Sequence, residues 1–151
     1  MAYQFTYFTN LGKLTIIEED KKIAEIIKGE VELHEVKETE LIKETQQQIS
    51  EYFKKQRQYF DVPLKLVGTP FQVSVWQEII KIPYGETRSY QDIAKAIGKP
   101  NAYRAVGSAT RMANKSILIP CHRVIKAGGK LGKFGDSLDL KIELLRFERD
   151  E

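Results

Sequence analysis

The spacing of apolar residues changes along this 151-residue chain, and the change limits the folds that the chain can adopt. Near the start, three short runs predict β-strands at Tyr3–Phe8, Lys13–Glu18 and Lys22–Ile27, separated by short polar turns. Apolar residues then recur at helical spacing over Glu40–Phe53. Strands joined by short turns pair antiparallel, so we expect a small N-terminal antiparallel sheet with one helix.

Proline and glycine residues interrupt this pattern in the middle of the chain, at Pro63, Gly68 and Pro70. We therefore predict a first domain at residues 1–65 and a second at residues 66–151. The apolar spacing after the interruption is mainly helical, so the second domain should be mostly helical. The two halves together predict an α+β protein.

Two short helices joined by a glycine-containing turn are expected within the second domain. Ser89 and Asp92 are three residues apart, a spacing typical of a helix N-terminus in which side chains and backbone cap one another. Gly98 should end that helix, and Asn101 should cap the next one, which runs to about Met112. Such a pair indicates a helix-turn-helix, although paired short helices are also common in proteins that do not bind DNA.

The second of these helices is expected to carry a narrow, basic face. Arg104, Ser108 and Arg111 recur at helical spacing on one side, with Gly107 beside them. The surrounding residues 88–133 contain ten lysines or arginines against one acidic residue, in a chain whose formal net charge is +3. Such a surface is typical of proteins that contact a phosphate backbone, but a solvated basic face without a partner has the same composition.

The single cysteine follows a buried-looking segment. Ile117–Ile119 is apolar and predicts a short strand, which Pro120 should end because proline cannot donate to a sheet. Cys121 comes next, and His122 and Arg123 follow it directly. A neighbouring histidine and arginine favour the thiolate form, so Cys121 is a candidate nucleophile. The alternative is a small cysteine that only fills the core.

The composition also sets expectations for the surroundings of the protein. No apolar run approaches the roughly 18 residues that a membrane-spanning helix needs, and the first residues do not resemble a secretion signal. A single cysteine cannot form an internal disulfide, which fits a reducing compartment, and it cannot supply a thiolate-rich zinc site. We therefore expect a cytoplasmic protein without a membrane span or a structural zinc site. We further expect a monomer that uses no cofactor and is nucleoid-associated when bound to DNA.

The residues around the cysteine, Ile119–Val124, resemble the active-site signature of the O6-alkylguanine-DNA alkyltransferases, the methylated-DNA–protein-cysteine methyltransferase family. The resemblance extends from about Pro70 to Glu148. It also includes the segments Phe71–Val75–Trp76, Ile82–Gly85, Ser89–Tyr90, Arg104–Gly107 and Leu144–Leu145. The first domain is similar only in its order of strands and helix. The resemblance implies a ribonuclease H-like first domain and a winged-helix-like second domain.

The resemblance also implies a reaction. O6-alkylated guanine would be flipped out of double-stranded DNA bound through its minor groove, and its alkyl group would pass irreversibly to Cys121, with O4-alkylthymine as a candidate second substrate. His122 resembles the base that deprotonates the thiol through a water molecule, and Glu148 the carboxylate that orients that base. Tyr90 resembles the aromatic residue that crowds the 3′ phosphate and gives a proton to the base.

Further residues take implied roles in binding. Arg104 resembles the side chain that replaces the flipped guanine in the stack. The other expected DNA-binding residues are Tyr103, Ala105, Gly107, Ser108, Arg111 and Arg123. The expected base pocket consists of Val124, Gly132, Phe134, Gly135 and Asp136. Phe134 stands where the family usually has tyrosine, and Asp136 is a candidate to narrow the pocket against bulky alkyl groups. Asn114, shifted by one position from the family pattern, is expected to support the helix-turn-helix.

Two other classes of function are weighed against this one. A binding module related to the family would mark damaged DNA without chemistry, but such proteins lack the nucleophile that Cys121 supplies. A helix-turn-helix regulator would use the cysteine structurally or to sense oxidants. The first 65 residues carry 10 basic against 12 acidic residues and the chain has no dimerisation heptad, and both features count against a regulator.

Overall fold

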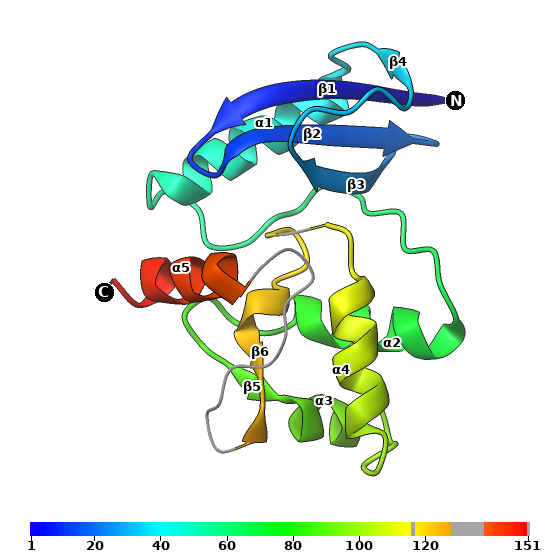
Figure 1. Cartoon of the computed structure of the whole chain (residues 1–151), viewed down its shortest axis with the longest axis vertical. Coiled ribbons are helices and arrows are strands. Elements are labelled where there is room, and N and C mark those ends of the chain that lie inside the picture. The colour runs from blue at the N-terminus through cyan, green and yellow to red at the C-terminus, as the bar shows by residue number, and fades with distance from the viewer. Residues whose placement is uncertain (116, 128–137, 151) are drawn as a thin grey trace. The chain divides into compact units, whose positions relative to one another are not determined.

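The protein divides into two compact units, Met1–Leu66 and Val67–Glu151, in a computed structural model that describes residues 1–115, 117–127 and 138–150 (Figure 1). Each unit has its own buried apolar residues. Within the described ranges, no helix combines the length and apolar character that crossing a membrane requires.

The first unit is a four-stranded sheet with one helix. Strands β1 (Ala2–Thr9), β2 (Gly12–Glu19) and β3 (Lys22–Lys28) form an antiparallel meander, which confirms the three predicted strands to within two residues at either end. A two-residue strand, β4 (Glu35–Val36), adds to β1 in parallel and gives the order β3-β2-β1-β4. The β2–β3 turn places Asp20 and Lys21 at positive φ, which suits the twist of a tight hairpin.

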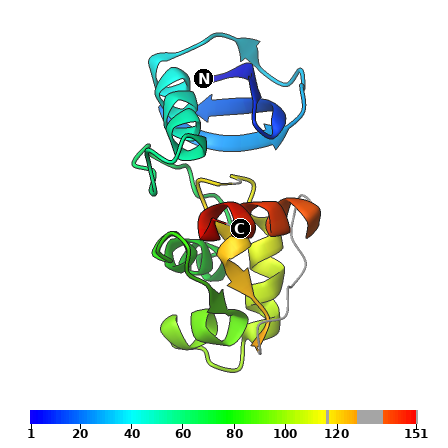
Figure 2. The same ribbon diagram turned by 90° about the vertical axis from the view of Figure 1, so that its left-hand side faces the viewer.

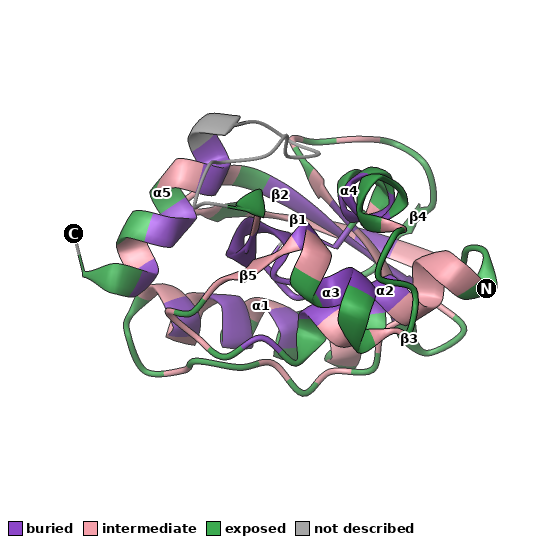
Figure 3. Ribbon diagram, turned by 90° about the horizontal axis from the view of Figure 1, so that it is seen from below, coloured by how far each residue is buried: buried purple, intermediate pink, exposed green. Residues whose placement is uncertain are grey.

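Helix α1 (Glu40–Phe53) covers one face of this sheet, as Figure 2 shows. It begins where the Thr39 side chain accepts a hydrogen bond from the backbone of Ile42, and its bounds match the prediction. Ile49 and Tyr52 are fully buried under the sheet. Most of β2 is buried as well (Figure 3), so the centre of the first core lies between this strand and α1.

The second unit is mainly helical, as predicted. Its elements are α2 (Pro70–Ile80), β5 (Arg88–Ser89), α3 (Tyr90–Ala96), α4 (Tyr103–Met112), a 3₁₀ turn at Cys121–Arg123, β6 (Val124–Ile125) and α5 (Leu138–Arg149). Helices α2, α3 and α4 pack together (Figure 1). The indole N–H of Trp76 on α2 donates to the backbone carbonyl of Ala109 on α4 at 2.9 Å, so α2 sets the position of α4.

Helices α3 and α4 form the predicted helix-turn-helix pair. Ser89 and Asp92 make the expected capping box, and Gly98, at φ +77°, follows the end of α3. The prediction for Asn101 was wrong: the residue that precedes α4 is Ala102, and no side chain caps that end. A backbone hydrogen bond from Ala102 to Lys99 tightens the connection instead, which leaves Asn101 inside the turn.

Candidate functional site

Cys121 lies at the start of the 3₁₀ turn, in a buried part of the second unit. The preceding residues Ile117–Ile119 are buried, but they do not form the predicted strand: Ile117 and Leu118 lie in a turn, with Ile117 at φ +73°, and Ile119 makes only an isolated bridge. A short apolar run marks burial without distinguishing a strand from a buried turn, which explains the error. Cys121 is itself buried, with 6% of its surface exposed.

His122 and Glu148, predicted to act together, are brought into contact. The Nε2 atom of His122 lies 2.6 Å from Oε2 of Glu148, and both side chains are buried. Glu148 comes from the last turn of α5, where a solvated glutamate would be ordinary. The backbone also holds this carboxylate, because the N–H of Gly85 donates to Oε1 of Glu148 at 3.1 Å.

Arg123 does not face outward, and its predicted role in DNA binding was wrong. Its Nε and Nη2 atoms donate to the two carboxylate oxygens of Glu148, each at 2.8 Å, and its Nη1 donates to the carbonyl of Ile82. Only 5% of its surface is exposed. A fork of this kind is the geometry in which arginine binds a carboxylate most strongly, so Arg123 fixes Glu148.

These contacts decide the charges of the pair. Burial by itself would raise the pKa of Glu148, but hydrogen bonds and positive charge from His122 and Arg123 outweigh it and hold the pKa well below its usual range. Burial lowers the pKa of His122 more than Glu148 raises it, so the imidazole is neutral near pH 7. An ionised carboxylate can only accept, so the Nε2 atom of His122 carries the proton and donates it.

The other ring nitrogen of His122 is therefore a lone-pair acceptor. Nδ1 is buried and has no hydrogen-bond partner among the residues that the structure describes. A neutral imidazole that donates from one nitrogen and has an unpaired lone pair on the other can act as a general base. His122 follows Cys121 directly in the 3₁₀ turn.

Lys141 is a further member of the site that the sequence analysis missed. It is fully buried on α5, and its Nζ donates to the carbonyl of Val124. Burial lowers the pKa of Lys141 to about 8, while the charge of Cys121 opposes that shift, so the two side chains interact. The ammonium must favour the Cys121 thiolate in return. The signal was present, since Lys141 precedes Leu144, Leu145 and Glu148 by three, four and seven residues on one helical face.

A cavity of about 490 Å³ opens beside α4. Its described lining consists of Tyr90, Gln91, Tyr103, Arg104, Gly107, Arg111, Lys126 and Ala127. Three of these side chains are cationic and none is acidic. Tyr90 is buried in the wall, and its hydroxyl has no hydrogen-bond partner among the described residues. The cavity therefore combines positive charge with a buried phenol.

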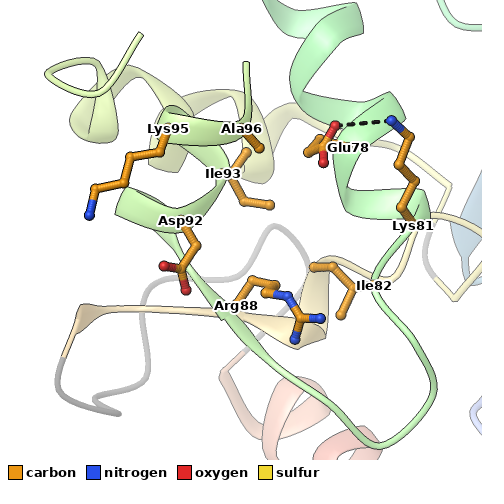
Figure 4. A pocket seen from close by; sticks show the side chains of 8 residues that line it. All are labelled: Glu78, Lys81, Ile82, Arg88, Asp92, Ile93, Lys95 and Ala96. Carbon is orange, nitrogen blue, oxygen red and sulfur yellow. Dashed lines mark hydrogen bonds and ion pairs between the residues drawn. The ribbon is translucent and has the colours of Figure 1, made fainter. Parts of the chain in front are cut away.

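A larger hollow, of about 710 Å³, lies between α2 and α3 (Figure 4). None of its described lining residues belongs to the predicted site. Most of its charged groups already have partners: Lys81 pairs with Glu78 at 3.3 Å, Arg88 pairs with Glu86 at 3.2 Å, and Asp92 caps α3. Among the described residues, no group of histidine, cysteine, aspartate or glutamate is arranged to hold a metal ion.

The family models cover both units. Residues 2–66 match the model described as "6-O-methylguanine DNA methyltransferase, ribonuclease-like domain", and residues 70–150 match the corresponding "DNA binding domain". The constitutive methylated-DNA–protein-cysteine methyltransferase of Bacillus subtilis is 44% identical over 159 residues, which cover 99% of this chain and 96% of that protein. This chain belongs to the 6-O-methylguanine DNA methyltransferase family.

Solved structures agree with this assignment. The O6-methylguanine methyltransferase of Mycobacterium tuberculosis superposes with a TM-score of 0.89 at 36% identity, over 99% of this chain and 94% of that one. A structure of Mycobacterium tuberculosis OGT in complex with DNA matches with a TM-score of 0.88 at 36% identity, over 98% and 93% of the two chains. The predicted family and fold class are confirmed.

The DNA-facing residues expected in a methyltransferase of this family lie mainly on α4. Arg104, Ala105, Ser108 and Arg111 are exposed there, and Tyr103 is 39% exposed. The placement of Gly107 on the same exposed face was wrong: it is buried, and a Cβ at its position would lie 3.8 Å from the ring of Tyr90. Because α3 packs against this side of α4, the helical spacing overestimated the width of the exposed face.

Only some of the remaining predicted site residues of this family member lie within the described part of the chain. Val124 is buried, and its carbonyl already accepts from Lys141. Asn114 is exposed and its side-chain oxygen accepts from Lys115, so its support of the helix-turn-helix stays a prediction. The expected pocket residues Gly132, Phe134, Gly135 and Asp136 lie outside the described residues.

Proposed function

We propose that this protein repairs alkylated DNA directly, by moving the alkyl group from O6 of guanine in double-stranded DNA onto Cys121. One observation carries the proposal: a neutral His122, held by an ionised Glu148, directly follows the cysteine in a chain whose relatives are named methylated-DNA–protein-cysteine methyltransferases. Because the chain has a single cysteine, no second thiol is available within it as the acceptor.

The transfer is a nucleophilic substitution at the alkyl carbon. Nδ1 of His122 takes the thiol proton, directly or through one water molecule, and the positive charge of Lys141 stabilises the thiolate. The sulfur then forms a bond to the alkyl carbon while the carbon–O6 bond breaks, and its electron pair passes to guanine. Tyr90 supplies the proton that the departing base needs. The product is a stable thioether, so each molecule reacts once.

We place the extrahelical nucleotide at the cavity beside α4, whose described lining includes Tyr90 but not Cys121. The O6 substituent of a stacked guanine points into the major groove, so a buried thiol requires the nucleotide to leave the helix. We propose that the narrow face of α4 enters the minor groove and that exposed Arg104 fills the gap in the stack. Arg104, Arg111 and Lys126 surround the cavity and favour a phosphate-bearing strand there.

Intact mass spectrometry tests the transfer. After incubation with a duplex that contains one O6-methylguanine, the protein should gain one methyl group, at most one per molecule, and peptide mapping should place it on Cys121. Cys121→Ala should gain none. A parallel duplex with O4-methylthymine reports the second substrate. An unmodified protein that still binds the lesion selectively would replace this proposal with a damage-marking module.

Arg104→Ala tests the flipping step separately. The variant should react with a methylated duplex about tenfold to a hundredfold more slowly, because unstacking costs a few kcal/mol without a replacement side chain. Its reaction with free O6-methylguanine base should change much less. An equal loss of reaction rate on duplex and free base would show that Arg104 does not replace the flipped base in the stack. The monomeric state and the cytoplasmic, nucleoid-associated location stay predictions.

A further inference from the structure

Three residues meet at one wall of the cavity beside α4. A Cβ built on Gly107 would lie 3.8 Å from the Cε2 and Cζ atoms of Tyr90 and 3.9 Å from Nη1 of Arg111. The guanidinium of Arg111 and the hydroxyl-bearing end of Tyr90 therefore approach the same point, over a residue without a side chain. Arg111 is one turn after Gly107 on α4, and its guanidinium lies back along the helix toward Tyr90.

The group that Arg111 approaches is buried and unpartnered. The hydroxyl of Tyr90 has no hydrogen-bond partner among the described residues, and 8% of the residue is exposed. Burial raises the pKa of Tyr90; the positive charge of Arg111 works against that rise, and the charge of Cys121 adds to it. Arg111 is therefore the charged neighbour that makes this phenol a better proton donor.

We infer that Arg111 is a positioning residue for Tyr90 in the alkyl transfer, a role separate from holding the phosphate backbone. The inference rests on the proposed function. As the sulfur–carbon bond forms and the carbon–O6 bond breaks, the electron pair moves onto guanine, and the O–H of Tyr90 gives its proton to the base. The phenolate that results lies beside the guanidinium of Arg111 and is stabilised by it until a proton returns from solvent.

Two residues frame this arrangement. Gly107 leaves the space that the guanidinium and the phenol ring share, so its burial has a reason beyond close approach to DNA. The charge of Cys121 acts on Tyr90 in the opposite sense to that of Arg111, because a thiolate makes the phenolate harder to form. Once the sulfur is alkylated its charge is gone, and Arg111 remains as the charge beside Tyr90. The arrangement therefore favours proton donation as the transfer proceeds.

A double-mutant cycle tests the coupling. The single-turnover rate constant for methyl transfer is measured at saturating duplex, so that DNA affinity does not enter, for the wild type, Arg111→Ala, Tyr90→Phe and the double variant. Tyr90→Phe should slow transfer by about a hundredfold, the scale of a lost general acid. Arg111→Ala should slow it by about tenfold in the wild type and by less than about twofold in the Tyr90→Phe background.

Controls separate this role from charge and folding. Arg146→Ala removes a positive charge from an exposed position on α5 and should leave the rate constant unchanged. Arg111→Lys keeps the charge and should recover part of the rate, and thermal unfolding checks that each variant is folded. If Arg111→Ala is unfolded, the cycle is run with Arg111→Lys and Arg111→Gln.

The outcomes are distinct. An equal rate loss from Arg111→Ala in both backgrounds would overturn the inference, as would a loss that appears only in DNA affinity. Both results leave methyl transfer to Cys121 intact in the wild type. If the wild type itself transfers no methyl group, the proposed function fails, which is a different result from a failed coupling.

Discussion

The two units bury polar groups in different ways. In the first unit, the Gln4 side chain donates to the carbonyl of Val31 and accepts from the backbone of Leu33 and His34. Thr15, also buried, donates to the carbonyl of Gly29. These groups are neutral, and they tie a loop to the sheet.

The second unit buries more ionisable groups: Lys115, His122, Arg123, Lys141 and Glu148, against Glu18 in the first unit, where that carboxylate accepts from the hydroxyl of Thr39. Among the described residues, each unit also leaves buried polar atoms without a hydrogen-bond partner: Oε1 of Gln46 in the first, and Nδ1 of His122 and the hydroxyl of Tyr90 in the second. Buried polar atoms cost stability unless they are hydrogen-bonded, and buried charges cost more unless they are paired. The first unit therefore uses its buried polar groups mainly to hold its own structure, whereas the second retains several ionisable groups close to the single cysteine.

The largest effect is expected at Glu148. Glu148→Gln should destabilise the protein by about 3 kcal/mol, because it leaves the buried guanidinium of Arg123 without a counter-charge. It should also slow methyl transfer, since His122 loses its anionic partner. Denaturant unfolding and single-turnover kinetics measure the two effects. Glu143→Gln, at an exposed position on the same helix, is the matched control and should change stability by less than about 0.5 kcal/mol.

The same variant carries a pH signature. The folded-state pKa of Glu148 lies below its unfolded value, so the carboxylate adds stability above about pH 4, and this stability is lost as the pH falls toward the folded pKa. Glu148→Gln should therefore lose stability at pH 7 and show a weaker decline on acidification than the wild type. A parallel decline in both proteins would show that the carboxylate is not ionised in the fold.

A smaller effect on stability, but a clear one on chemistry, is expected at Lys141. Lys141→Met removes the buried ammonium beside Cys121, so methyl transfer at pH 7 should slow by about tenfold and recover as the pH rises and the thiolate forms unaided. Arg146→Ala, which removes an exposed charge from α5, should leave the rate unchanged. An unchanged rate in Lys141→Met would make this lysine a structural donor to Val124 only.

Lys141 also predicts a change in pH-dependent stability. Its pKa is about 8 in the folded protein and about 10.4 for an ordinary lysine, so the unfolded chain binds more protons between these values. Lys141 therefore makes wild-type stability rise with pH across that window, and Lys141→Met should lack this rise. Unfolding free energies at pH 7.5, 9 and 10 for the two proteins, chosen to span roughly this range, measure the difference.

The elements that the sequence could predict are those with local causes. The three strands and α1 follow from apolar spacing and short turns, and α3 follows from the capping pair of Ser89 and Asp92. Strand β4 could not be predicted, because its two residues pair with Tyr3 and Gln4 of β1, about thirty residues earlier. The side chain of Gln4 also accepts hydrogen bonds from the backbone of the two residues that precede β4. Asn101 failed for a related reason, since backbone bonding in the turn decided where α4 begins.

At the site, the sequence predicted which residues take part better than it predicted whether each one is buried or exposed. Cys121 and His122 are neighbours in the chain, so a local motif sufficed for them. The sequence does not tell whether Arg123 binds a phosphate or a buried carboxylate. Its partner Glu148 is 25 residues away in the chain, and only the fold brings the two together. Lys141 was overlooked because a lysine is expected at the surface, although its spacing from Leu144 and Glu148 placed it on the apolar face.

The smallest effect is expected in the first unit, at Thr15. Thr15→Val keeps the shape of the side chain but removes a buried hydroxyl that donates to Gly29 and pairs with Thr6 at 2.8 Å, so stability should fall by about 1 to 2 kcal/mol. Thr6→Val should cost less, because the Thr15 hydroxyl keeps its bond to Gly29. Methyl transfer by the folded variants should equal that of the wild type. A slower transfer in Thr15→Val would mean that buried polar groups in the first unit also serve the chemistry, and the two units would then not differ in how they use such groups.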